Sequence, residues 1–236
     1  MEALANWAKG IDLYWIITEL FVVLTAVIAL TVHECSHAFA AMLLGDDTAK
    51  RMGRLTLNPL KHVSLSGLLM LAVFHFGWAK PVPADMRRFK NPKVGMALTA
   101  LAGPVSNVFL ALLGCVVKHF LITVLWNARD SVIAGASVLY YVCLFVEIFT
   151  LLNAGLAVFN LLPISPLDGS KILGIILPQN AYAWLMRYER YGMFVLIALL
   201  LLGVLDGPLE FLRSGLLNGL NVVAALPFPP HPLFLY

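Results

Sequence analysis

The chain has 236 residues, of which 61% are hydrophobic and only 12% are charged, and its mean hydropathy is +0.87. A soluble domain is roughly half apolar and about a quarter charged, so the surplus of apolar side chains must face lipid. The same figures exclude a disordered chain and a disulfide-stapled chain, and a scattered net charge of +3 excludes a nucleic-acid-binding surface. We therefore expect an all-α polytopic membrane protein.

Five apolar stretches have the pattern of helices: residues 13–44, 94–126, 132–161, 191–205 and 208–226. A membrane span needs about 20 residues, so the first three stretches are long enough to cross. The last stretch carries Glu210, Arg213, Asn218 and Asn221, and could either cross or lie in the interface. The sequence thus predicts a bundle of about four to six transmembrane or interfacial helices.

The segment between residues 45 and 93 holds the positive charge, with nine of the sixteen basic residues. The positive-inside rule places both of its ends in the cytoplasm, so the short apolar run at 65–78 is expected to be a small re-entrant hairpin. Residues 77–83 of this hairpin could offer a strand edge to a bound peptide. It follows that the ends of the first and third helices meet near the cytoplasmic face.

A single domain over residues 1–236 is the simplest organisation, because no repeat or appended soluble segment is visible. We divide it into a core at 13–171, C-terminal helices at 172–226 and a short Pro-rich tail at 227–236.

Residues 33–37 read H-E-C-S-H within the first apolar stretch. Side chains four positions apart share one face of a helix, so His33 and His37 can bind one Zn²⁺ at about 2.0–2.1 Å. Glu34 can then act on a water molecule as the general base. The purely structural alternative is that helix packing buries these groups. However, burying ionisable groups at membrane depth costs free energy, and such groups are usually functional.

A catalytic zinc site usually has three protein ligands, and the third is expected at the cytoplasmic end of the third helix. There the chain reads FNLLPISPLDG, with Asp168 after two prolines, Pro163 and Pro166, that interrupt the helix. An Asp-Gly pair alone is more often a surface turn. The membrane depth that Asp168 shares with His33 and His37 makes it the candidate third ligand.

The ordered set of HECSH, GRLTLNPLKH, GWAKPVP, AGPVSN and NLLPISPLDG resembles the site-2 protease family of intramembrane zinc metalloproteases, in its compact prokaryotic branch. The resemblance implies a metalloendopeptidase of the prokaryotic cell membrane with one Zn²⁺ per chain. The implied partners are a transmembrane substrate protein and the lipid bilayer, with no nucleic acid.

The resemblance also assigns residues: His33, His37 and Asp168 match the metal ligands, and Glu34 matches the catalytic glutamate. Supporting or substrate-binding roles are implied for Asn160, Pro163, Gly169, Gly103 and Asn107. For Gly103 and Asn107, close helix packing and a hydrogen bond across helices are equally good explanations. The chain departs from the family at residues 62–67, where similar chains often read H-x-D-P-x-G and this one reads HVSLSG.

Two alternatives stay open. His62 and His75 flank or lie within the hairpin, but we expect neither to be a ligand. The rival function is that of a non-proteolytic metal-binding membrane protein, such as a zinc transporter or a silent scaffold. The presence of Glu34 favours the protease, because a transporter needs ligands but no general base.

Overall fold

A computed structural model describes residues 12–64, 66–67, 70, 79–127 and 136–228 of the chain. The described residues form helices and no extended strand, as expected for an all-α membrane protein. Three helices are long and apolar enough to cross a membrane, and a bent helix pair could supply a fourth span. The expected class, a polytopic helical bundle, is therefore confirmed.

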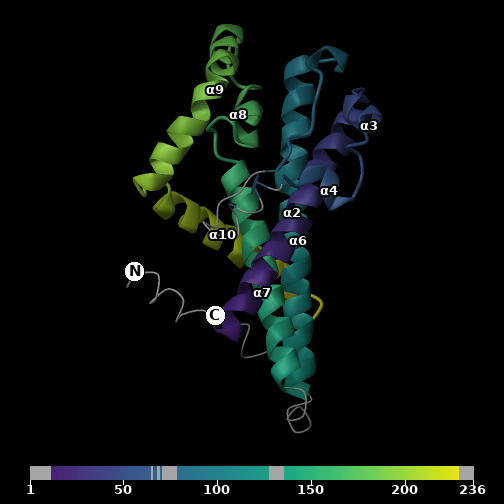
Figure 1. Ribbon diagram of the computed structural model, residues 1–236, viewed down its shortest axis with the longest axis vertical. Helices are drawn as coiled ribbons and strands as arrows, with labels where there is room; N and C mark the ends of the chain where they lie inside the picture. Colours follow the sequence, from purple (N-terminus) through teal and green to yellow (C-terminus); the bar gives the residue numbers. More distant parts are fainter. Residues whose placement is uncertain (1–11, 65, 68–69, 71–78, 128–135, 229–236) are drawn as a thin grey trace.

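The three long helices are α2 (Leu13–Leu43), α6 (Pro92–Asn127) and α7 (Ala136–Asn160). In Figure 1, α6 and α7 run side by side along the long axis, and α2 packs against both. Many alanines on these helices are almost fully buried, whereas large apolar side chains on the same helices are exposed. The buried alanines are Ala26, Ala29, Ala38, Ala41, Ala97, Ala100, Ala111, Ala154 and Ala157. Small residues let membrane helices approach closely, which leaves the larger side chains for lipid.

The C-terminal part differs from the expectation at one boundary. Helix α9 (Gln179–Leu201) begins well before residue 191, because a polar first half continues into the apolar half. Helix α10 (Asp206–Ala225) follows after a bend of 89° and packs against α6 and α7. Gly203 lies at the bend with a φ of 67°, a left-handed conformation that glycine adopts readily.

Short elements connect α2 to α6 on one side of the bundle. They are α3 (Thr48–Arg51), α4 (Pro59–His62) and the 3₁₀ turn η1 (Met86–Arg88). Val63 and Ala79 form an antiparallel bridge, which brings the two ends of the expected hairpin together. Most of residues 65–78 lie outside the described residues, so the re-entrant path of the hairpin stays a prediction.

Helix α7 ends at Asn160, and the loop that contains Pro163 and Pro166 leads into the short helix α8 (Asp168–Leu173). Proline cannot donate the backbone hydrogen bond that a helix interior needs, which explains the break. Helix α8 packs against α6, so the loop carries Asp168 back toward the bundle.

Candidate metal centre

Three potential metal ligands meet between α2 and α8. The Oδ2 of Asp168 lies 3.1 Å from the Nε2 of His33 and 3.2 Å from the Nε2 of His37. One donor atom from each of the three residues lies within 4.8 Å of the others, and all three residues are buried. The helical spacing of four places the two imidazoles on one face of α2, and the proline-broken loop supplies the carboxylate from the opposite side.

The outer nitrogen of each imidazole has its own partner on α6. The Nδ1 of His37 lies 2.7 Å from the backbone oxygen of Thr99, and the Nδ1 of His33 lies 2.6 Å from the Oδ1 of Asn107. Because a carbonyl oxygen only accepts, we assign the proton of each ring to Nδ1. Each neutral ring then turns the lone pair of Nε2 toward Asp168.

This donor set fits a divalent metal ion. Two imidazole lone pairs and a carboxylate oxygen face one another, and a shared cation relieves their mutual repulsion. An ionised Asp168 and two nitrogen donors are a common zinc ligand set, with room for a water or a substrate.

Glu34 lies beside these ligands and is itself buried. Its Oε2 accepts a hydrogen bond from the backbone N–H of Val82 at 3.0 Å. The three ligands and Glu34 line a cavity of about 160 Å³, whose other walls come from α6, the α7–α8 region and the segment before η1: Pro81, Val82, Ala84, Met96, Thr99, Ala100, Asn160, Pro166 and Lys171. The cavity is therefore large enough for water and for part of a peptide backbone.

Two glycines allow the elements around the cavity to approach. A Cβ added to Gly103 would lie 2.5 Å from ring atoms of His37, and one added to Gly169 would lie 2.3 Å from the backbone oxygens of Leu161 and Leu162. Both distances are too short for any side chain. Gly103 thus lets α6 press against the imidazoles, and Gly169 lets α8 fold back on the end of α7.

The remaining candidates are placed as follows. Asn160 lines the cavity and donates from Nδ2 to the backbone oxygen of Leu156, whereas Pro163 is not among the described residues that line it. His62 is fully buried and its Nε2 lies 2.7 Å from the backbone oxygen of Thr56, apart from the ligand cluster. His75 lies outside the described residues.

Sequence reasoning missed Asn153 on α7, which is fully buried. Asn107 donates from Nδ2 to the Oδ1 of Asn153 at 3.0 Å, and Asn153 donates from Nδ2 to the backbone oxygen of Phe149 at 2.8 Å. This order of donors fixes which way the Asn107 amide faces, and so presents its oxygen to His33. A polar amide in the middle of an apolar helix is the signal that could have identified Asn153.

Comparison with known proteins places this geometry in a family. Residues 21–203 match Peptidase family M50. YwhC of Bacillus subtilis, named as a candidate zinc metalloprotease, is 40% identical over 179 residues, which cover 76% of this chain and 79% of the relative.

Two mycobacterial relatives, both named Rip2 and described in the same way, are each 31% identical. The Mycolicibacterium smegmatis protein aligns over 75% of this chain and 65% of its own length, and the Mycobacterium tuberculosis protein over 76% and 66%. No solved structure matches the chain significantly. With more than half of its length matched, the chain belongs to Peptidase family M50, the site-2 protease family of metalloproteases.

Proposed function

We propose that this protein is a zinc-dependent intramembrane endopeptidase that hydrolyses peptide bonds within or next to the transmembrane helices of its substrates. One observation carries the proposal: two imidazoles and a carboxylate converge beside a buried glutamate on an apolar helix long enough to span a membrane. The names of the relatives support zinc as the metal.

His33, His37 and Asp168 would hold one zinc ion per chain, through the two Nε2 atoms and a carboxylate oxygen. When bound, the metal polarises the scissile carbonyl and makes a water molecule more acidic. Asn107 and the Thr99 carbonyl keep each imidazole in the tautomer that can bind metal.

Glu34 is the general base. Its carboxylate accepts the proton of the attacking water and later returns it to the leaving amine nitrogen as the peptide bond breaks. The N–H of Val82 orients this carboxylate by its hydrogen bond to Oε2. Asn160, on another wall of the cavity, is placed to contact the substrate backbone.

The substrate must unwind before it can react, because a transmembrane helix keeps its carbonyl groups in internal hydrogen bonds. The large exposed apolar side chains on α2, α6 and α7 suit a lipid environment from which such a helix can approach. The basic residues of α3, α4 and η1 support a position of the active site near the cytoplasmic face of the cell membrane, because cytoplasmic loops carry an excess of lysine and arginine.

The rival function, zinc transport or a silent scaffold, uses the same ligands but has no need of Glu34. The position of Glu34 in the cavity wall beside all three ligands favours the protease.

Metal analysis of the purified protein, combined with co-expression of single-span membrane proteins, tests this proposal. We expect the wild type to hold about one zinc per chain and to cleave a co-expressed substrate. Asp168→Ala should lose most of its zinc and should not cleave that substrate. His62→Ala is the matched control and should retain zinc, because His62 lies outside the cluster. Full zinc retention in Asp168→Ala would overturn the ligand assignment, and zinc transport without cleavage would favour the rival.

A further inference from the structure

A short segment before η1, residues 79–85, crosses the cavity wall, and we call it the strap. Its N–H groups bond outward along its length: Lys80 donates to the backbone oxygen of His62 at 2.6 Å, and Val82 donates to Glu34. The guanidinium of Arg54 donates to the backbone oxygens of Lys80 and Pro81. The strap is thus held at its start and touches the proposed catalytic base at its middle.

The N–H of Val82 has no neighbouring N–H on either side, because both adjacent residues are prolines. Pro81 and Pro83 flank it and have no N–H, so Val82 supplies the only backbone donor between Lys80 and Ala84. That donor is bound to Glu34. In this conformation residues 80–83 offer no free N–H to a substrate strand, so strand-edge pairing at these residues would have to use their backbone oxygens.

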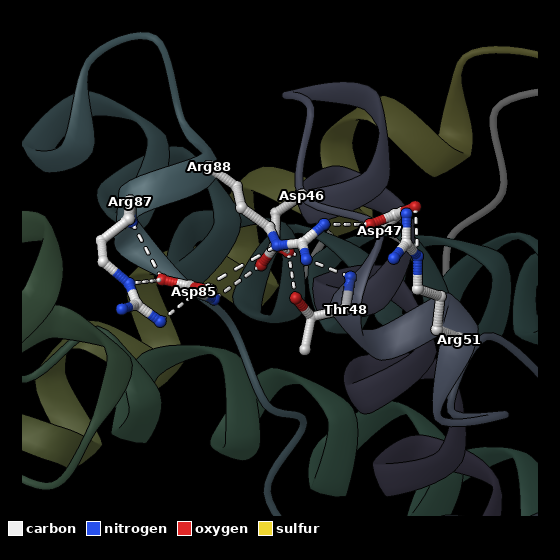
Figure 2. Close-up of polar contacts among 7 residues, drawn as sticks. All are labelled: Asp46, Asp47, Thr48, Arg51, Asp85, Arg87 and Arg88. Carbon is white, nitrogen blue, oxygen red and sulfur yellow. Dashed lines mark hydrogen bonds and ion pairs between the residues drawn. The ribbon is translucent and has the colours of Figure 1, made fainter.

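The far end of the strap is held by Asp46. This carboxylate is completely buried, and its two oxygens have different partners. Oδ1 accepts from the backbone N–H and the hydroxyl of Thr48, two residues away, whereas Oδ2 accepts from the backbone N–H of Asp85 at 2.7 Å. Figure 2 shows Arg88 lying between Asp46, Asp47 and Asp85, and its guanidinium reaches all three carboxylates.

Asp46 is also firmly attached to the helix that carries Glu34. Helix α2 ends at Leu43, and Gly45 then adopts a φ of 104°, so that the N–H of Asp46 donates back to the oxygen of Ala41 at 2.9 Å. A rigid helix therefore joins Glu34, which bonds the middle of the strap, to Asp46, which bonds its end.

We propose that Asp46 is a positioning residue that sets where the strap lies along α2 and thereby holds the Val82 N–H on Glu34. The effect of Asp46 on catalysis rests on the proposed function, whereas its effect on the position of the strap does not. Only Pro83 and Ala84 lie between Val82 and Asp85, so a shift at one end of this proline-stiffened segment moves the other. The alternative is that Asp46 only caps the turn into α3, a task that needs Oδ1 alone.

Asp46→Asn separates the two roles, because the amide keeps an oxygen for Thr48 but places an NH₂ group against the Asp85 N–H. Asp46→Ser is a second variant, since serine can still accept from the Thr48 N–H but is too short to reach Asp85. Asp47→Asn is the matched control: Asp47 is adjacent and exposed to a greater extent, and its partners are Arg51 and Arg88.

Hydrogen–deuterium exchange of the full-length protein in detergent, resolved to single amides, reads the geometry without any activity assay. We expect exchange at Val82 to rise at least about tenfold in Asp46→Asn and Asp46→Ser, because its hydrogen bond to Glu34 opens more often. Asp47→Asn should exchange like the wild type. Unchanged protection of Val82 in both Asp46 variants would overturn the proposal, because Asp46 would then cap its own turn and nothing more.

The kinetic arm uses a substrate that the wild type cleaves and Glu34→Gln does not. Asp46→Asn should lower kcat about tenfold or more while KM and zinc content stay close to wild type, because a misplaced base affects the transition state rather than binding. Faster exchange at Val82 with an unchanged kcat would also overturn the positioning role. If the wild type cleaves no substrate, the proposed function fails, and the exchange arm still decides whether Asp46 holds the strap.

Discussion

The Nδ1 of His33 lies 2.6 Å from the Oδ1 of Asn107, although the two residues are 74 positions apart and belong to different membrane-spanning helices. Asn107 is itself held by Asn153 on a third helix. Helices α2, α6 and α7 are thus linked through one buried chain of hydrogen bonds that ends at a proposed zinc ligand.

Replacing Asn107 should weaken metal binding without removing a ligand. Asn107→Leu deprives the Nδ1 proton of His33 of its acceptor, so we expect zinc affinity to fall about 10–100-fold. Asn153→Leu, one step further away, should cause a smaller fall. Competition with a metal-sensitive dye measures both, and Ser106→Ala is the control, because the Ser106 hydroxyl donates to the Gly103 oxygen of its own helix. Equal affinity in Asn107→Leu and wild type would show that the bond has no role in metal binding.

Gly103 should tolerate no side chain. Gly103→Ala would place a Cβ 2.5 Å from His37, so the imidazole must turn away from Asp168 and zinc occupancy should drop sharply. Gly155→Ala is the matched control in a spanning helix, because a Cβ there meets no atom within 4 Å. Metal analysis of the two purified variants compares them. Retention of zinc by Gly103→Ala would mean that α6 can move away from α2 at little cost.

Removing one partner of the ion pair between Lys118 and Glu147 should destabilise the protein more than removing both partners. Their Nζ and Oε2 atoms lie 2.7 Å apart between α6 and α7, within the membrane-spanning segments. Lys118→Met leaves an unpaired carboxylate at membrane depth, so it should lower Tm more than the double variant Lys118→Met/Glu147→Met does. Thermal unfolding in detergent measures this order. A double variant less stable than either single variant would contradict it.

The attachment of the strap to Asp46 should weaken in acid. Hydrogen bonding to Arg87 lowers the pKa of Asp85 to about 2, and burial of Asp46 is outweighed by its bonds from Thr48 and the Asp85 N–H, so its pKa is also lowered. Carboxyls with a pKa lowered in the folded state stabilise it above their unfolded pKa, and this contribution disappears as pH falls below about 4 and through the lowered pKa.

Amide exchange checks this, with each rate corrected for the intrinsic effect of pH. Protection of the Asp85 N–H should decline over that range, while the Lys80 N–H, which bonds a carbonyl oxygen, should keep its protection. If the protection of both N–H groups declined in parallel, the protein would instead be unfolding as a whole.

Much of the fold and the ligand cluster follows from local pattern. Apolar length locates α2, α6 and α7, the spacing of His33 and His37 predicts a shared helix face, and the prolines before Asp168 predict the break after α7. The start of α9 was predicted too late, because the apolar pattern begins only in its second half.

The partners of the ligands could not be predicted in this way. The acceptor for His37 is a backbone oxygen of Thr99, which leaves no trace in side-chain pattern. Asp46 resembles an ordinary acidic residue after a helix, and its hydrogen-bond partner Asp85 comes from far along the chain. Contacts of this kind depend on tertiary packing rather than on the local sequence.

Glu34→Gln, measured for substrate cleavage and for bound zinc in the same preparation, separates a zinc protease from a protein that only binds the metal. Glutamine keeps the shape of glutamate and its hydrogen bond to Val82 but cannot accept the proton of water. We expect cleavage to fall at least about 100-fold, the usual contribution of a general base, while zinc content stays close to wild type. Glu210→Gln on α10, paired with Arg213 away from the ligand cluster, should cleave normally. Cleavage by Glu34→Gln at the wild-type rate would show that Glu34 is not the general base.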